Sequence, residues 1–283
     1  LDKVLDMLPV KKTAHPEANL KLAIVGRPNS GKSTLLNSLI GYARAVVSDV
    51  PGTTRDSIDE DFIYHKKRIT VIDTAGIRKK SRITDAVDFY SLTRTIESIE
   101  RCDVVVHLID AEAGLTETDK KISDEIMKAR KPVIIAVNKW DLIEKDHRTF
   151  DTFIDRLKFQ FYKASDFPII SISAKHKQRL TRIIDKSLEL KGRASQKIET
   201  PRLNRLMAQI QSSRRIPQLQ SSIKIYYATQ TDSTPPRFKL FVNNPEHFRK
   251  DIVRYFEKSL QKELGLEGIP IDIQIEGKKK KKK

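Results

Sequence analysis

The octapeptide GRPNSGKS at residues 26–33 has the glycine spacing of a loop that wraps around phosphate groups. Glycines at both ends allow backbone N–H groups to curl around a polyanion, because a residue without Cβ tolerates unusual dihedral angles. Lys32 is placed to reach the β- and γ-phosphates of a nucleotide, and the Ser33 hydroxyl to bind Mg²⁺. The candidate phosphate-binding residues are Gly26, Arg27, Pro28, Asn29, Ser30, Gly31, Lys32, Ser33 and Thr34.

Two later segments carry groups that would close over the γ-phosphate. In residues 45–56, Thr54 would offer its hydroxyl to Mg²⁺ and its N–H to the phosphate, although a surface turn rich in Pro, Gly and Thr is an alternative interpretation. In residues 73–76, Asp73 is suited to hold Mg²⁺ through water, and the N–H of Gly76 can contact the γ-phosphate. Lys32, Thr54 and Gly76 are therefore candidate catalytic residues, and Ser33, Thr54 and Asp73 candidate Mg²⁺ ligands.

The tetrapeptide Asn-Lys-Trp-Asp at residues 138–141 indicates which nucleotide base is bound. The carboxylate of Asp141 can accept two hydrogen bonds from the N1–H and the exocyclic amine of guanine, which adenine cannot present in that arrangement. The N–H of Ala174 can meet the guanine carbonyl oxygen. An exposed polar turn would explain the tetrapeptide alone, but not its order after a phosphate loop and an Asp-x-x-Gly segment. The candidate guanine-binding residues are Asn138, Lys139, Asp141, Ser173, Ala174 and Lys175.

These residues all follow short apolar segments that alternate with helical patterns. The predicted strands are residues 21–25, 68–72, 104–109, 133–137 and 169–172, and the predicted helices are residues 33–40, 88–99, 118–129, 149–162 and 180–190. Continuous β-branched strands between helices predict a doubly wound, mostly parallel α/β sheet of the P-loop NTPase type. Such a sheet binds ligands at the carboxyl ends of its strands, where the candidate residues lie.

The pattern changes after Gly192. A helix at residues 202–211, strands at 223–228 and 238–242, a helix at 247–264 and a strand at 271–275 predict a small α+β domain with helices on one face of its sheet. Four aromatic residues fall on these strands. At such positions we favour core packing over stacking on nucleic-acid bases for Tyr226, Tyr227, Phe238 and Phe241.

Composition narrows the class of protein. The chain has 283 residues, 39% of them hydrophobic, without a membrane-length apolar run or a secretory signal, so we expect a cytoplasmic protein with no membrane anchor. Its single cysteine, Cys102, is predicted to be a small buried residue between a helix and a strand. The net charge of +17, with 19 Lys or Arg against 9 Asp or Glu in residues 194–283, favours a polyanionic partner such as RNA. A solvated surface is the alternative interpretation, since six of these positive residues are the terminal run 278–283 and the excess without them is four.

With these residues in place, the chain resembles the bacterial EngA/Der family of double GTPases. The resemblance is carried by residues 90–94, 99–103, 115–119, 138–142, 225–230, 235–238, 241–243 and 268–271. It implies the family's second GTPase domain and its C-terminal KH-like domain, with the first GTPase domain absent. The expected divisions are a linker with the remnant of a helix (1–19), a GTPase domain (20–193), a KH-like domain (194–277) and a basic tail (278–283).

The resemblance also implies a function. The expected protein binds GTP and GDP, hydrolyses GTP with Mg²⁺, and acts in large-subunit ribosome assembly by docking on ribosomal RNA. A KH module normally grips RNA with a G-x-x-G loop. The segment from Gly265 to Gly268 follows a helix and supplies no positive charge, so we expect the KH shape without that grip. The alternatives are a constitutive RNA-binding adaptor with a structural nucleotide pocket and, less favoured, a membrane-acting GTPase with an intact KH loop.

One expected catalytic group is replaced. Small guanine-nucleotide switches have a water-orienting glutamine after Asp-x-x-Gly, and here that residue is Ile77. The resemblance implies that K⁺, bound by Asn29 and by the loop before Thr54, takes over part of the electrostatic role, so Asn29 is also a candidate catalytic residue. Ser30 and residues 175–178 differ from the family pattern.

Overall fold

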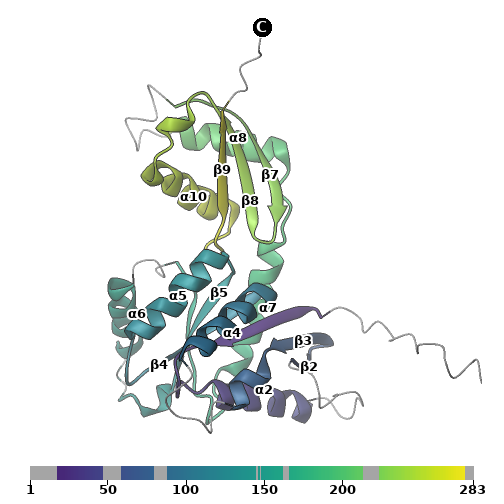
Figure 1. Ribbon diagram of the computed structural model, residues 1–283, viewed down its shortest axis with the longest axis vertical. Coiled ribbons are helices and arrows are strands. Elements are labelled where there is room, and N and C mark those ends of the chain that lie inside the picture. The colour runs from purple at the N-terminus through teal and green to yellow at the C-terminus, as the bar shows by residue number, and fades with distance from the viewer. Residues whose placement is uncertain are drawn as a thin grey trace, which may run out of the picture.

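The computed structural model describes residues 18–46, 59–79, 88–144, 146, 148–161, 166–212 and 223–277. Its strands form a six-stranded sheet and, farther along the chain, a three-stranded sheet at the other end of the molecule (Figure 1). Thr54, residues 1–17 of the predicted linker and the tail 278–283 lie outside the described residues.

The six-stranded sheet has the order β2-β3-β1-β4-β5-β6 and is parallel except for β2. β4 and β5 are buried along their whole length, because helices cover both faces. All five predicted strands are present, and the predicted doubly wound sheet is confirmed. The strands are β1 Leu20–Val25, β2 Glu60–Tyr64, β3 Lys67–Ile72, β4 Val104–Asp110, β5 Val133–Asn138 and β6 Ile169–Ser171.

Helices pack on both faces of this sheet, as Figure 1 shows. Leucines of α2 and isoleucines of α7 pack on one face, against side chains of β1 such as Leu22. Ile99 of α4 and Ile122 of α5 pack on the other face with Cys102, which is 2% exposed, as predicted. The helices are α2 Lys32–Val46, α3 Thr74–Lys79, α4 Asp88–Arg101, α5 Glu117–Ala129, α6 Thr149–Gln160 and α7 Leu180–Ala194.

One strand and one α-helix of the described residues, β2 and α3, were not predicted. β2 is an edge strand that pairs antiparallel to β3 and buries only Phe62 and Tyr64, so it lacks a continuous apolar run. α3 has six residues, too few to show an amphipathic repeat, and it begins directly after Asp73. Gly76 therefore lies inside a short helix that starts at the end of β3.

The second sheet has the order β7-β8-β9, with β7 antiparallel and β9 parallel to β8. Buried and part-exposed residues alternate strictly along β8, because α8 and α10 cover one face only. The predicted α+β order is confirmed, but Tyr226 and Tyr227 are 50% and 45% exposed, so core packing was wrong for both. The elements are α8 Thr200–Ser212, β7 Ile225–Ser233, β8 Pro236–Val242, α10 Lys250–Leu264 and β9 Asp272–Gly277.

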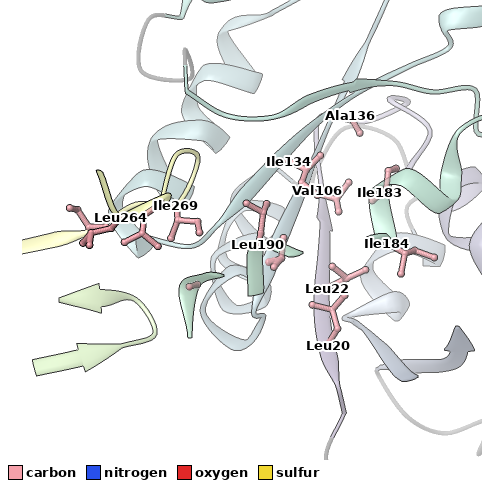
Figure 2. Close-up of a cluster of buried hydrophobic side chains, with 14 of the residues drawn as sticks. Leu20, Leu22, Val106, Ile134, Ala136, Ile183, Ile184, Leu190, Leu264 and Ile269 are labelled. Atoms are coloured by element: carbon pink, nitrogen blue, oxygen red, sulfur yellow. The ribbon is translucent and has the colours of Figure 1, made fainter. Parts of the chain in front are cut away.

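The two sheets share one apolar core. Leu190 of α7 lies between side chains of the six-stranded sheet and the pair Leu264 and Ile269 (Figure 2). Polar contacts border it: Arg193 Nε donates to the Gly265 carbonyl at 2.6 Å, and Arg130 Nη1 to the Ile271 carbonyl at 3.0 Å. Across the described ranges, no helix combines the length and apolar character that a membrane span requires.

Candidate nucleotide-binding site

The predicted phosphate loop connects β1 to α2 at the carboxyl edge of the six-stranded sheet. Its conformation demands the glycines at both ends. A Cβ at Gly26 would lie 2.5 Å from the Leu108 carbonyl oxygen, and one at Gly31 would lie 2.2 Å from Asn138 Nδ2. Gly31 and Asn29 also have positive φ angles of 99° and 62°. Residues with a Cβ seldom adopt such angles, although asparagine does so more often than most. The glycines therefore allow the backbone of the loop to lie close to its neighbours, where a side chain would not fit.

Lys32 is held against the loop that precedes it. Its ammonium group donates to the carbonyls of Gly26 at 2.8 Å and Arg27 at 2.7 Å. α2 begins at this residue, so the positive end of the helix dipole faces the same region. The ammonium, the helix start and the backbone N–H groups together form a site suited to a polyanion.

The predicted Mg²⁺ ligands come from two neighbouring elements. The Ser33 hydroxyl donates to the Ile77 carbonyl at 2.7 Å, which joins the start of α2 to α3. Asp73 has a φ of 54°, and its N–H donates to Asp59 Oδ1 at 2.9 Å. A serine hydroxyl and a carboxylate are the hard oxygen donors that Mg²⁺ prefers, so the donor set fits this ion.

Asn138, the last residue of β5, ties two loops together. Its Nδ2 donates to the Ser30 carbonyl at 2.9 Å, and its Oδ1 accepts the Ala174 N–H at 2.9 Å. Asn138 is 3% exposed, so both bonds lie in the interior, where they are difficult to replace. The Ala174 N–H, which the sequence analysis assigns to guanine, is used here within the protein.

Asp141 lies in the short 3₁₀ helix η1 (Trp140–Leu142), which Trp140 anchors by packing on Phe150 and Phe153. The Ser173 hydroxyl is the main group that holds the pKa of Asp141 below its usual value. His176 lowers it further, with Nε2 at 3.5 Å from Asp141 Oδ2. Asp141 therefore presents a charged acceptor beside the Ser173 loop.

Asp110, at the end of β4, was not predicted. Its Oδ2 pairs with Lys139 Nζ at 2.7 Å and with Arg27 Nη2 at 3.3 Å, so it joins the guanine-motif loop to the phosphate loop. Burial alone would raise the pKa of Asp110, but the Lys139 ammonium and the Glu112 N–H lower it overall. Its place at the carboxyl end of a predicted strand was the available sequence signal.

The structure thus brings the phosphate-loop and guanine-motif residues to one edge of the sheet, with Lys139 and Arg27 sharing the partner Asp110. Asn29 is exposed, and Lys175 and His176 lie on the exposed side of the second loop. Thr54 lies outside the described residues.

Comparison with known proteins agrees with this arrangement. Residues 21–139 match the family described as 50S ribosome-binding GTPase, and residues 197–276 match the KH-domain-like C-terminal part of EngA bacterial GTPase enzymes. The fold and the site therefore define a P-loop GTPase domain followed by a KH-like domain.

Curated relatives of one name match nearly the whole chain. GTPase Der of Chlorobium limicola is 43% identical over 279 residues, which span 97% of this chain and 64% of the relative. GTPase Der of Caldanaerobacter subterraneus is 40% identical over 274 residues, spanning 96% of this chain and 62% of the relative. The chain is similar to GTPase Der over nearly its whole length and spans less than two thirds of the length of these relatives.

Among solved structures, Era bound to MgGDPNP and a fragment of 16S ribosomal RNA is 23% identical to the chain, with a TM-score of 0.46. The match covers 91% of this chain and 92% of that chain.

Proposed function

We propose that this chain binds GTP, hydrolyses it to GDP and phosphate with Mg²⁺, and acts as a nucleotide-controlled switch in large-subunit ribosome assembly. The observation that carries the proposal is the charged Asp141, set in a loop that Asn138 and Asp110 connect to the phosphate loop. A guanine held by Asp141 would place its phosphates over residues 26–33.

Base selection follows from the chemistry of Asp141. Its carboxylate would accept the guanine N1–H and exocyclic amine, whereas adenine would leave the charge without these donors. Hydrogen-bonding pockets of this kind discriminate by about 10⁴ or more. Because the Ala174 N–H is bonded to Asn138, we assign base selection mainly to Asp141.

Phosphate handling falls to Lys32, Ser33 and Asp73. Lys32 would place its charge near the β- and γ-phosphates, while Ser33, Asp73 and Thr54 would hold Mg²⁺ directly or through water. Mg²⁺ supplies charge neutralisation at the phosphate oxygens. Ser33 would exchange its hydrogen bond to Ile77 for that role, which couples the start of α3 to nucleotide binding.

We further propose that K⁺ substitutes for the missing glutamine at Ile77. The side-chain oxygen of Asn29 is a suitable hard donor, and this residue stands exposed at the tip of the loop with a left-handed φ of 62°. Replacing K⁺ by Na⁺ should slow hydrolysis several-fold. Equal rates in the two salts at equal ionic strength would remove the role of K⁺ and leave the GTPase proposal intact.

Docking on RNA in the bacterial cytoplasm is assigned to the KH-like part. The excess of positive residues in 194–283 supports a polyanionic partner of this part. The match of residues 21–139 to a family described as 50S ribosome-binding supports a ribosomal partner for the chain. We place the division at residues 193 and 194, so that residues 20–193 form the GTPase unit and residues 194–277 the docking unit.

Multiple-turnover hydrolysis of GTP tests the proposal. Wild-type chain should release phosphate repeatedly from GTP, and Lys32→Ala should lower the rate by about 10² or more, because it removes a charge that faces the transferred group. A wild-type chain that binds GTP without turnover would favour the adaptor with a structural pocket. Co-sedimentation with large ribosomal subunits should then depend on whether a GTP analogue or GDP is present. Equal binding in both states would contradict a switch.

A further inference from the structure

Beneath the phosphate loop, Arg27 of the loop meets two titratable side chains that belong to none of the assigned motifs. Asp119 of α5 is 0% exposed and His107 of β4 is 1% exposed. Arg27 reaches them from the phosphate loop, with its side chain 24% exposed although it lies one residue from the surface residue Pro28. An arginine in an exposed loop usually extends into water, so its inward course requires a partner.

Two carboxylates face Arg27 there: Asp110, which lies 3.3 Å from its Nη2, and Asp119. Arg27 Nε lies 4.0 Å from Asp119 Oδ2, and His107 Nε2 lies 3.8 Å from Asp119 Oδ1. In the part of the chain that the structure describes, four buried side-chain N or O atoms have no hydrogen-bond partner, and three of them are Arg27 Nε, His107 Nε2 and Asp119 Oδ1. Buried polar atoms without hydrogen bonds are costly, so their collection at one point of the site indicates a function.

The position of Asp119 is fixed from the other side. Thr116 donates to Asp119 Oδ2 through its N–H at 3.0 Å and its hydroxyl at 2.7 Å, in the capping box that opens α5. Burial would raise the pKa of Asp119, but His107 and Thr116 lower it overall, so the carboxylate is charged. A helix cap needs only a hydrogen-bond acceptor. The Asp119 carboxylate fills that role and also places a negative charge near Arg27.

We propose that Asp119 is a positioning residue for nucleotide binding: through Arg27 it fixes the phosphate loop against β4 and α5. Arg27 also contacts Asp110, which contacts Lys139 of the guanine-motif loop. The series of charged contacts Asp119–Arg27–Asp110–Lys139 thus holds the phosphate-binding and base-binding ends of the pocket at a fixed separation. This inference rests on the proposed nucleotide binding.

The dissociation rate of a fluorescent GDP analogue, measured on the whole chain with Mg²⁺, tests it. Asp119→Asn keeps one oxygen acceptor for the Thr116 cap, removes the charge and replaces the other oxygen with an amide donor. It should speed GDP release about tenfold, a usual size for coupling between sites. Thr116→Val is the matched control, since it weakens the same cap but leaves the charge. It should lower the melting temperature and speed release by less than Asp119→Asn does, because Asp119 keeps its charge.

A double-mutant cycle with Arg27→Gln separates positioning from general loosening. If Asp119 acts through Arg27, the double variant should release GDP no faster than the faster of the two single variants. Unchanged release in Asp119→Asn, or fully additive effects in the cycle, would overturn the inference. Should Asp119→Asn fail to fold, Asp119→Ser, which also keeps an oxygen acceptor for Thr116 without the charge, takes its place in both tests. Wild-type chain that binds no GDP would instead contradict the proposed function.

Discussion

The nucleotide end of the six-stranded sheet and the junction with the three-stranded sheet use the same kinds of polar contact in different surroundings. At the nucleotide end, Asn138 and Asp110 are 3% and 5% exposed. At the junction, the side chains of Arg193 and Glu267 pair at 3.0 Å while 27% and 55% exposed. Because water screens exposed charges, contacts at the nucleotide end should cost far more to break.

The largest expected effect is a change of base. Asp141→Asn replaces one acceptor with an amide that can donate to the additional carbonyl of xanthine and no longer matches the two guanine donors. We expect GTP affinity to fall by a factor on the order of 10³ or more, with XTP binding gained. Titration with GTP and XTP measures both. If GTP affinity hardly changed, Asp141 would not be the base-selecting residue.

The next effect concerns close packing in the phosphate loop. Gly31→Ala puts a Cβ 2.2 Å from Asn138 Nδ2 at a φ of 99°, so it should displace Asn138 and lower the free energy of unfolding by about 3 kcal/mol. Gly41 in α2 is the control, because a Cβ there meets nothing within 4 Å. Gly41→Ala should stabilise by about 0.5–1 kcal/mol. Urea unfolding compares the two, and equal stabilities would refute the tight loop.

A smaller, pH-dependent effect is expected for Asp110. Its lowered pKa means that the charged form stabilises the fold above the unfolded pKa of about 4, and that this stabilisation is lost as pH falls through the folded pKa. Asp110→Asn should therefore cost about 2 kcal/mol at pH 7 and progressively less below pH 4. Unfolding curves at several pH values measure this. A cost that does not change with pH would exclude the charge as its cause.

The smallest effect is expected at the junction. A Cβ at Gly268 would lie 2.9 Å from Pro168 Cδ and 3.1 Å from the Asp166 carbonyl oxygen, whereas one at Gly265 meets nothing within 4 Å. Both glycines have positive φ, 77° and 66°, so Gly265→Ala controls for backbone strain. Gly268→Ala should lower the free energy of unfolding by about 1 kcal/mol more than Gly265→Ala does, as measured by urea unfolding, without slowing GTP hydrolysis. Identical losses would show that the junction is loosely packed there.

The nucleotide end and the three-stranded sheet also differ in how much of their structure could be predicted from the sequence. The strands and loops of the nucleotide site follow from continuous apolar runs, each ending in a polar motif, and the structure has them at one edge of the sheet. Asp110 and Asp119 were missed as site residues because their ion-pair partners come from other elements, and no local pattern links Asp119 to Arg27. Side-chain networks between distant segments become visible only in three dimensions.

In the second region, alternation identified the strands but not their exposed face. Tyr226 and Tyr227 follow each other across a register shift between β7 and β8, so both are exposed instead of alternating. Phe238, in the regular part of β8, is fully buried as predicted. The irregular pairing of β7, which the sequence does not signal, explains the difference.

Calorimetric titration of the wild-type chain with GTP and with ATP, both with Mg²⁺, tests the central claim most directly. Asp141 and the phosphate loop together predict a single site that binds GTP at least 10³ times more tightly than ATP, since only guanine offers the matching donors. Equal affinity for the two nucleotides, or no uptake of GTP, would contradict the account.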